Sequence, residues 1–285
     1  FHIVFGKTVP DISLNAVANL GYAWGIFHQP VYPGDTLSTE SEVIGLKQNS
    51  NGKTGTVYVR STGRNQRGET VLSYVRWAMV RKRHHHSAPF ERHVPDLPKA
   101  VPVDELDPPR DMRFTGYDTG LTAQPFLFED YDPGERIDHV DGLTIEEAEH
   151  QMATRLFHNT ARVHFNQFYE QDGRFGRRIV YGGHIISIAR ALTFNGLGNA
   201  VSVLAINGGK HTNPSFAGDT IFAWSEIVSK HELPGRSDAG ALRVRTVATK
   251  DRPCSDFPHT DEAGTYDPSV VLDLDLTLLM PRRGA

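Results

Sequence analysis

The chain has 285 residues, 39% hydrophobic and 22% charged, which suits one large domain or two modest ones and excludes a small disulfide-held scaffold. A formal charge of −4 provides no basic excess for nucleic-acid phosphates, and the single cysteine, Cys254, has no partner for an internal disulfide. We therefore expect a cytoplasmic protein without a nucleic-acid partner. Because no run of about 18 apolar residues occurs, we expect no membrane partner either.

In chain order, the first elements point to a helix followed by strands. Residues 11–23 read as an enclosed helix, and a Gly-Asp-Thr turn follows at 34–36. Residues 56–62 and 70–80 read as strands that flank a turn at 65–68. The first part of the chain therefore combines one helix with antiparallel strands.

The later elements repeat this order. An entry strand is expected near 128–139, and Thr144 followed by Glu147 predicts a capping box for a helix that ends at about His158. Residues 183–197 are apolar on nearly every side, as in a helix enclosed by its own domain. Finally, leucines alternate with polar residues from Leu272 to Leu278, which predicts a strand with one buried face.

A sequence repeat explains this similarity. Residues 30–43 and 214–227 share Pro, Gly-Asp-Thr and Ser-Glu at matching positions, and Asp35 and Asp219 are expected to accept local backbone hydrogen bonds there. Two shorter landmarks recur in the same order. Phe5-Gly6 matches Phe175-Gly176, and Met79 matches Met280. The chain is therefore expected to contain two copies of one α+β unit, each an antiparallel sheet wrapped round a central helix, as in a double hot-dog fold.

The repeat also predicts domain boundaries. We place the first half at residues 1–83, a proline-rich linker at 84–125 and the second half at 126–285. The first half has only four residues before Phe5, whereas the second has a strand and a helix before its matching landmark. We therefore expect that the first copy lacks its opening third and that Phe1 is not the native start.

The densest polar cluster precedes the second enclosed helix. It runs from His158 to His164 and is followed by Tyr181-Gly-Gly-His184. This order resembles the MaoC-like, or R-specific enoyl-CoA hydratase, family, which carries Asp-x-Asn-Pro-x-His and then His-Gly at the start of the hot-dog helix. In this sequence Asn159, Ala161, Arg162 and His164 fall on the four fixed positions of the first motif, and Tyr181-Gly182 falls on the second.

Within that family, three segments resemble the branch that hydrates mesaconyl-CoA or dehydrates beta-methylmalyl-CoA. They are residues 11–23, 158–166 and 182–192. The resemblance covers both halves and implies hydration or dehydration of a dicarboxylic 2-enoyl-CoA by a homo-oligomer. Coenzyme A is then part of the substrate, and neither a separate cofactor nor a metal is implied. Two departures are that Asn159 replaces the family aspartate and that only the second half shows the motif, so the principal site could involve residues before Phe1.

The cluster suits the addition of water to an unsaturated thioester. His164 is the candidate general base, because imidazole titrates near neutrality, and Asn159 would orient the water or the imidazole. Gly182 and Gly183 would let the thioester oxygen approach backbone N–H groups at a helix N-terminus. The alternatives are a structural histidine, a helix cap and a tight turn.

The basic and polar residues nearby are candidates for substrate binding. Arg162 would hold the distal carboxylate in a bidentate fork, or it is a surface arginine. Tyr181 and His184 border the glycines. The candidates for the phosphates of coenzyme A, which a solvated basic face would explain equally well, are Arg177, Arg178 and Lys210.

Two further functions remain open. An acyl-CoA thioesterase on the same fold would need a carboxylate where Asn159 stands, and a noncatalytic acyl-CoA binding protein would not. The run His84 to His86 is expected to be solvated rather than metal-binding.

Overall fold

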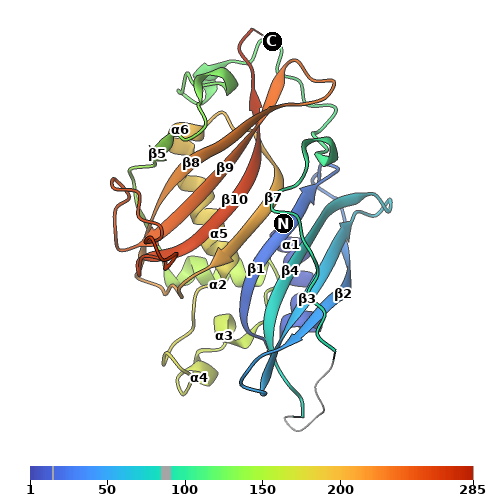
Figure 1. The fold of residues 1–285 in the computed structure, drawn as a ribbon, viewed down its shortest axis with the longest axis vertical. Helices are drawn as coiled ribbons and strands as arrows, with labels where there is room; N and C mark the ends of the chain where they lie inside the picture. The colour runs from blue at the N-terminus through green and yellow to red at the C-terminus, as the bar shows by residue number, and fades with distance from the viewer. Residues whose placement is uncertain (15, 85–90, 285) are drawn as a thin grey trace.

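The computed structural model describes residues 1–14, 16–84 and 91–284, so most of the run His84 to His86 lies outside the described residues. Its strands form one antiparallel ten-stranded sheet (Figure 1). The strand order is β2-β3-β4-β1-β7-β10-β9-β8-β5, with β6 paired to β8. Among the described residues, no helix combines the length and apolar character needed to cross a bilayer.

The elements fall on either side of a seam between β1 and β7. On the first side are α1 (His2–Lys7), the π-helical turn η1 (Val9–Ser13), β1 (Ala16–Phe27), β2 (Ser38–Gln48), β3 (Thr54–Arg64) and β4 (Thr70–Arg81). The connecting chain holds η2 (Val103–Glu105) and η3 (Thr119–Leu121). On the second side are η4 (Phe128–Asp130), β5 (Arg136–Asp138), β6 (Leu143–Thr144), α2 (Glu147–Leu156), α3 (Arg162–Phe165), α4 (Gln167–Glu170), α5 (Gly182–Leu192), α6 (Phe194–Leu197), β7 (Ser202–His211), β8 (Thr220–Glu232), β9 (Ala239–Lys250) and β10 (Val270–Pro281).

The helix predicted for residues 11–23 is wrong. Residues 16–23 belong to β1. The helical residues of the first half lie before that strand, in α1 and η1. β1 pairs with β4 on one side and with β7 on the other, so its backbone N–H and C=O groups are used by the sheet. These long-range pairings stabilise the strand against the helical tendency of its apolar residues.

Glycines allow β1 to occupy the seam. A Cβ atom on Gly21 would lie 2.4 Å from Cζ2 of Trp77, and one on Gly25 would lie 3.0 Å from Cβ of Ile206 on the partner strand. The largest buried cluster contains side chains from both sides, including Tyr22 and Leu278. The two hot-dog units therefore share one sheet and the largest hydrophobic cluster.

The second enclosed helix is confirmed. α5 and α6 occupy nearly all of residues 183–197, and Ile185, Ile188 and Ala189 are buried in the core. Figure 1 shows α5 behind the strands of the second half. The backbone kinks at Gly196, whose φ of 99° favours glycine.

Two of the three repeat landmarks are confirmed. Gly34 and Gly218 have φ values of 94° and 95° in equivalent turns before β2 and β8. In each turn the aspartate accepts a backbone N–H at 2.9 Å, Asp35 from residue 32 and Asp219 from residue 216. Met79 and Met280 lie on the equivalent strands β4 and β10.

The Phe-Gly landmark is not a structural repeat. Gly6 lies within α1, whereas Gly176 lies in a loop before α5 with a φ of 66°. The short sequence match therefore joins residues in unrelated elements. In the chain order of the two halves, α1 and η1 correspond to α5, because each precedes the seam strand of its own half.

Two local predictions near the second half are also corrected. Thr144 does not cap α2, since it lies in β6 and its hydroxyl lies 2.8 Å from that of Thr220. The helix begins at Glu147, and Glu146 at its N-cap makes no side-chain capping bond. The entry strand expected near 128–139 shortens to η4 and the three residues of β5.

The strand β10 is buried on both faces, contrary to the prediction of one buried face. Asp275 and Thr277 are buried because the connecting chain crosses the outer face of the sheet. Val101 donates its N–H to Oδ1 of Asn207, whose amide donates to Asp275 at 2.8 Å. Arg243 completes the cluster with an ion pair of 2.6 Å to Asp275. The polar residues of the alternating pattern are thus paired beneath the connecting chain.

Candidate active site

His164 lies on the short helix α3 and is fixed by the backbone. Its Nδ1 lies 3.0 Å from the carbonyl oxygen of Ile179, and the side chain of Gln151 donates to its own carbonyl oxygen. Because a carbonyl can only accept, Nδ1 carries the proton and Nε2 keeps its lone pair. Burial lowers the pKa of His164 to about 4, so the imidazole is neutral near pH 7. His164 is therefore held as a neutral imidazole whose Nε2 can accept a proton.

Tyr181 is the centre of the cluster. Its ring centroid lies 5.8 Å from that of His164, and its backbone N–H donates to Nε2 of His150 at 3.0 Å. The ring of His150 lies 6.5 Å from His164 and 6.4 Å from His184. Burial raises the pKa of Tyr181 well above its ordinary value, so the phenol stays protonated. Three histidines therefore surround one buried tyrosine.

Residues of the first half complete this histidine cluster. His2 Nδ1 lies 3.4 Å from the hydroxyl of Tyr181, and its Nε2 lies 2.9 Å from the hydroxyl of Ser187. Tyr22 lies across the seam from His211, with 3.3 Å between its hydroxyl and Nε2. Burial is the largest cause that lowers the pKa of His2, His150 and His211 to about 4. We call His2, His150, His164, His184, His211, Tyr22 and Tyr181 the seam cluster.

The sequence reasoning missed four members of the seam cluster. His2 and His211 belong to no motif, and Tyr22 lies in the segment 11–23, which the sequence predicts as a helix. Tyr22 and His211 meet through the pairing of β1 with β7. His150 carried a usable signal, because it lies on the buried face of α2 with Ala153, where a histidine needs a partner.

The two predicted glycines begin α5 at the seam cluster. A Cβ atom on Gly182 would lie 2.6 Å from Nε2 of His211, and one on Gly183 would lie 2.3 Å from Cζ of Tyr181. Both positions therefore require glycine for packing against the cluster's own side chains. Their proposed contact with the thioester oxygen stays a prediction.

Asn159 is almost fully buried beside the cluster. Its Oδ1 accepts the N–H of Ala161 at 3.1 Å, just after His158 with its φ of 56°. This bond shapes the turn between α2 and α3 and uses the amide oxygen. Orientation of water by Asn159 stays a prediction, and it would have to use the amide nitrogen.

The predicted arginines point elsewhere in this structure. Arg162 is exposed, with its guanidinium carbon 5.1 Å from the ring centroid of Tyr169. Arg177 lies 3.9 Å from the ring centroid of Phe216, and Arg178 forms an ion pair with Glu147. Lys210 lies over Tyr266 at 4.4 Å. No hydrogen bond found in residues 1–14, 16–84 and 91–284 joins these cations to the seam cluster.

His184 has one ring nitrogen without a hydrogen-bond partner among the described residues. Its backbone N–H donates to the carbonyl oxygen of Tyr181, while its Nε2 is buried and finds no hydrogen-bond partner in the described chain. Burial lowers its pKa, so this nitrogen belongs to a neutral ring. A buried polar atom without a partner is costly unless a ligand or water satisfies it.

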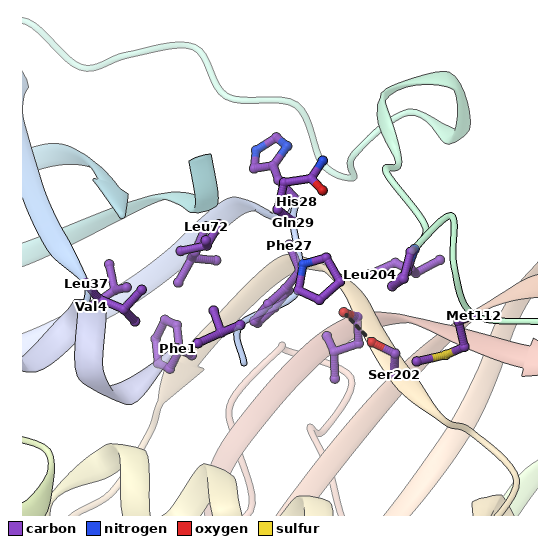
Figure 2. Close-up of a pocket in the computed structure, with 15 residues that line it drawn as sticks. Phe1, Val4, Phe27, His28, Gln29, Leu37, Leu72, Met112, Ser202 and Leu204 are labelled. Atoms are coloured by element: carbon purple, nitrogen blue, oxygen red, sulfur yellow. Dashed lines mark hydrogen bonds between the residues drawn. The ribbon is translucent and has the colours of Figure 1, made fainter. Parts of the chain in front are cut away.

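An apolar pocket of about 310 Å³ lies outside the seam cluster, none of whose members lines it. Figure 2 shows Phe1, Val4 and Leu37 on one side of it and Ser202 and Leu204 on the other. The pocket therefore lies between the two halves of the sheet. Its remaining labelled residues are Phe27, His28, Gln29, Leu72 and Met112.

Phe1 connects the pocket to the seam cluster. Its ring centroid lies 5.7 Å from that of Tyr22 and 5.4 Å from that of Tyr74. Pockets that bind small molecules are typically apolar with a few convergent polar groups. The pocket and the seam cluster together have that character.

Comparison with known proteins identifies the family of the chain. A family model described as "FAS1-like, dehydratase domain region" matches residues 4–74. The chain is 67% identical to the beta-methylmalyl-CoA dehydratase of Chloroflexus aurantiacus, with 100% of this chain and 81% of that protein covered. It is 56% identical to the mesaconyl-CoA hydratase of Cereibacter sphaeroides, with 99% and 81% covered.

Solved structures agree with this fold. A MaoC domain dehydratase from Chloroflexus aurantiacus is 67% identical with a TM-score of 0.97, covering 100% of this chain and 81% of that one. A Mycobacterium tuberculosis protein with a double hot-dog fold, 24% identical, has a TM-score of 0.69 over 98% of this chain and 79% of that one. The high identity to two relatives over nearly the whole chain shows that it belongs to the MaoC-like double hot-dog dehydratase family, which includes beta-methylmalyl-CoA dehydratase and mesaconyl-CoA hydratase.

Proposed function

We propose that this chain catalyses the reversible interconversion of mesaconyl-CoA and beta-methylmalyl-CoA, as a hydro-lyase of the enoyl-CoA hydratase type. The observation that carries this proposal is 67% identity, over the whole chain, to a protein named for that dehydration. The seam cluster supports it, because neutral, partly buried imidazoles suit proton transfer without a permanent charge.

The reaction needs a base, an acid and a site for negative charge. In our proposal, Nε2 of His164 takes a proton from water as its oxygen bonds to the β-carbon. The thioester oxygen gains negative charge in the enolate, and the N-terminus of α5 at Gly182 and Gly183 would stabilise it. The protonated His164 then gives a proton to the α-carbon, which completes the addition and regenerates the neutral base.

We further propose that no cofactor is needed beyond the coenzyme A of the substrate. Water addition to a conjugated thioester involves proton transfer and charge stabilisation, with no change in oxidation state for a cofactor to absorb. The histidines and tyrosines of the seam cluster are groups that can transfer protons, and the backbone N–H groups at the start of α5 can stabilise the charge.

One assay separates the proposed function from its alternatives. The purified chain is mixed with mesaconyl-CoA, and the absorbance of the conjugated thioester and the free thiol are followed together. We expect the absorbance to fall to an equilibrium value without thiol release. Thiol release would instead identify a thioesterase, and an unchanged mixture with measurable binding would identify a binding protein.

We also propose that the chain forms a homo-oligomer. Large aromatic side chains are exposed on α3 and α4, with Phe165 at 45%, Phe168 at 81% and Tyr169 at 58%. Such exposed apolar groups are typical of surfaces that associate. Light scattering coupled to size-exclusion chromatography should give at least twice the 31.7 kDa chain mass. A cytoplasmic location remains our proposal from the single cysteine.

A further inference from the structure

Arg76 is a fully buried cation on β4, facing the core of the first half. Its side chain is 0% exposed, and Nη2 donates to the hydroxyls of Thr8 at 2.9 Å and Ser13 at 3.1 Å. Its guanidinium carbon lies 4.5 Å from the ring centroid of Phe5. Nε and Nη1 have no hydrogen-bond partner in the described chain. Two of the three guanidinium nitrogens are therefore unsatisfied.

A buried guanidinium normally has a carboxylate partner, since an uncompensated charge is costly to desolvate. No aspartate or glutamate among the described residues forms an ion pair with Arg76. Its contacts are hydroxyls and aromatic rings, which are weaker partners for a full charge. The arrangement is that of a cation whose anionic partner is not part of this fold.

The polar neighbours of Arg76 are also incompletely bonded. The Tyr74 hydroxyl makes no hydrogen bond of standard geometry, although the hydroxyls of Thr8 and Ser61 are close to it. Asn19 stands opposite Ala78 in the β1–β4 pairing, two residues along from Arg76 and so on the same face of the sheet. Both polar atoms of its amide are buried without a partner. Several unsatisfied groups thus share one face.

Arg76 is in the same core as the catalytic candidates. Its ring partner Phe5 lies 6.0 Å from Tyr181, and Tyr22, which opposes Arg76 on β1, contacts His211. Tyr181 experiences the charge of Arg76, which acts to lower its pKa against the larger effect of burial. The ring centroid of Phe1, which lines the pocket, lies 5.4 Å from the ring centroid of Tyr74 on this face.

We propose that Arg76 is the residue that binds the second carboxylate of the substrate and so selects a dicarboxylic acyl group. A carboxylate would accept a charge-assisted hydrogen bond from Nε or from Nη1, the two donors that the fold leaves open. This role replaces the one that sequence reasoning gave to Arg162, whose guanidinium is exposed against Tyr169. The inference rests on the proposed function, because it concerns the substrate of that reaction.

The test compares two thioesters that differ in the second carboxylate. kcat/KM is measured with mesaconyl-CoA and with crotonyl-CoA for the parent chain and for Arg76→Met, which keeps the packing volume but removes the charge. We expect kcat/KM for mesaconyl-CoA to fall about ten- to a hundredfold, as for loss of one charge-assisted hydrogen bond. The value for crotonyl-CoA should not fall, so the ratio of the two should shift toward it.

Three further variants separate this role from others. Arg76→Lys keeps the charge without the planar fork and should give an intermediate ratio. Arg60→Met, at an exposed position on the neighbouring strand β3, should leave both values unchanged. Equal losses on both substrates for Arg76→Met would show a purely structural role and overturn the proposal. A selective loss in Arg162→Met alone would return the carboxylate to Arg162 and overturn it equally.

A binding measurement keeps the inference testable apart from turnover. Mesaconyl-CoA should raise the melting temperature of the parent more than crotonyl-CoA does, and this difference should vanish in Arg76→Met or, if that variant does not fold, shrink in Arg76→Lys. A difference that persists in the variant would overturn the proposal. If the parent turns over neither thioester but shows the selective stabilisation, the proposed reaction fails while the carboxylate site stands.

Discussion

At the scale of single residues, the protonation state of His164 follows from its surroundings. The carbonyl oxygen of Ile179 fixes the proton on Nδ1, and burial disfavours a second proton on Nε2. Replacing His164 by alanine should lower kcat about a hundredfold or more with little change in KM, because the base acts in the transition state. Steady-state kinetics with mesaconyl-CoA measure this effect.

The matched control for that variant is His231→Ala. His231 lies on β8, where its Nε2 contacts the hydroxyl of Ser229 at 2.8 Å, away from the seam cluster. We expect its replacement to leave kcat unchanged. Near-normal turnover in His164→Ala, with folding intact by circular dichroism, would show that the base is another residue.

The same lowered pKa makes a prediction about pH. A base must be unprotonated to act, and a pKa of about 4 keeps His164 unprotonated throughout the range from pH 5 to 8. kcat/KM should therefore show no acidic limb near pH 6.5, the ordinary pKa of a histidine. A tenfold fall between pH 7 and pH 5.5, in protein that stays folded, would contradict this description of His164.

The sequence could reveal only the part of the site that is contiguous in the chain. His164, Tyr181 and Gly182 stand in the order of a known motif, and the structure brings them together. His2 and Arg76 belong to the other half, which the pairing of β1 with β7 joins to this one in a single sheet. Neither the amino-acid composition nor the spacing of motifs in the sequence predicts that long-range pairing.

At the scale of elements, the repeat predicted the fold better than local periodicity did. The Gly-Asp-Thr turns precede equivalent strands, because glycine at positive φ and an aspartate that accepts a backbone N–H impose one geometry in both halves. Periodicity failed at residues 11–23, since a short apolar segment suits either a buried helix or a buried strand. The neighbouring strands of the sheet, which the local pattern does not contain, decide between them.

The seam strand gives a sharp test of packing. Gly21→Ala would place a methyl group 2.4 Å from the Trp77 ring, so the free energy of unfolding should fall by about 1–3 kcal/mol. Gly208→Ala is the matched control on β7, because its methyl group would meet only the carbonyl oxygen of Tyr22 at 3.8 Å. Urea denaturation of both variants measures the difference. Equal stability of the two would show that Trp77 moves aside without cost.

At the scale of the whole molecule, the shared core couples the two halves. Buried side chains from α1, β1, α5 and β10 belong to the largest hydrophobic cluster, so opening either half would expose part of the core of the other. We expect urea to unfold the chain in one transition, with fluorescence and circular dichroism curves that coincide. Two separated transitions would show that the β1–β7 seam is weaker than the rest of the sheet.

The seam cluster also makes stability depend on pH. His2, His150, His164 and His211 have a pKa of about 4 when folded and about 6.5 when unfolded. The unfolded chain therefore binds more protons between these values, so the stability is complete above pH 6.5 and is lost as the pH falls toward 4. One such histidine contributes at most about 3 kcal/mol, and the four are not additive because their charges interact.

The free energy of unfolding, measured in urea at pH 7.5, 6.0 and 5.0, should therefore fall steadily through this series. The carboxylates of the chain do not explain a loss in this range, because the pKa of Asp273, for example, is lowered from 3.8 and its protonation belongs to more acidic solutions. His150→Gln removes one titrating ring, and its amide can still accept the N–H of Tyr181. Its stability should fall less steeply from pH 7.5 to pH 5.0 than that of the parent. Equal slopes would show that His150 is already solvated in the folded chain, and the buried seam cluster would then lose one of its members.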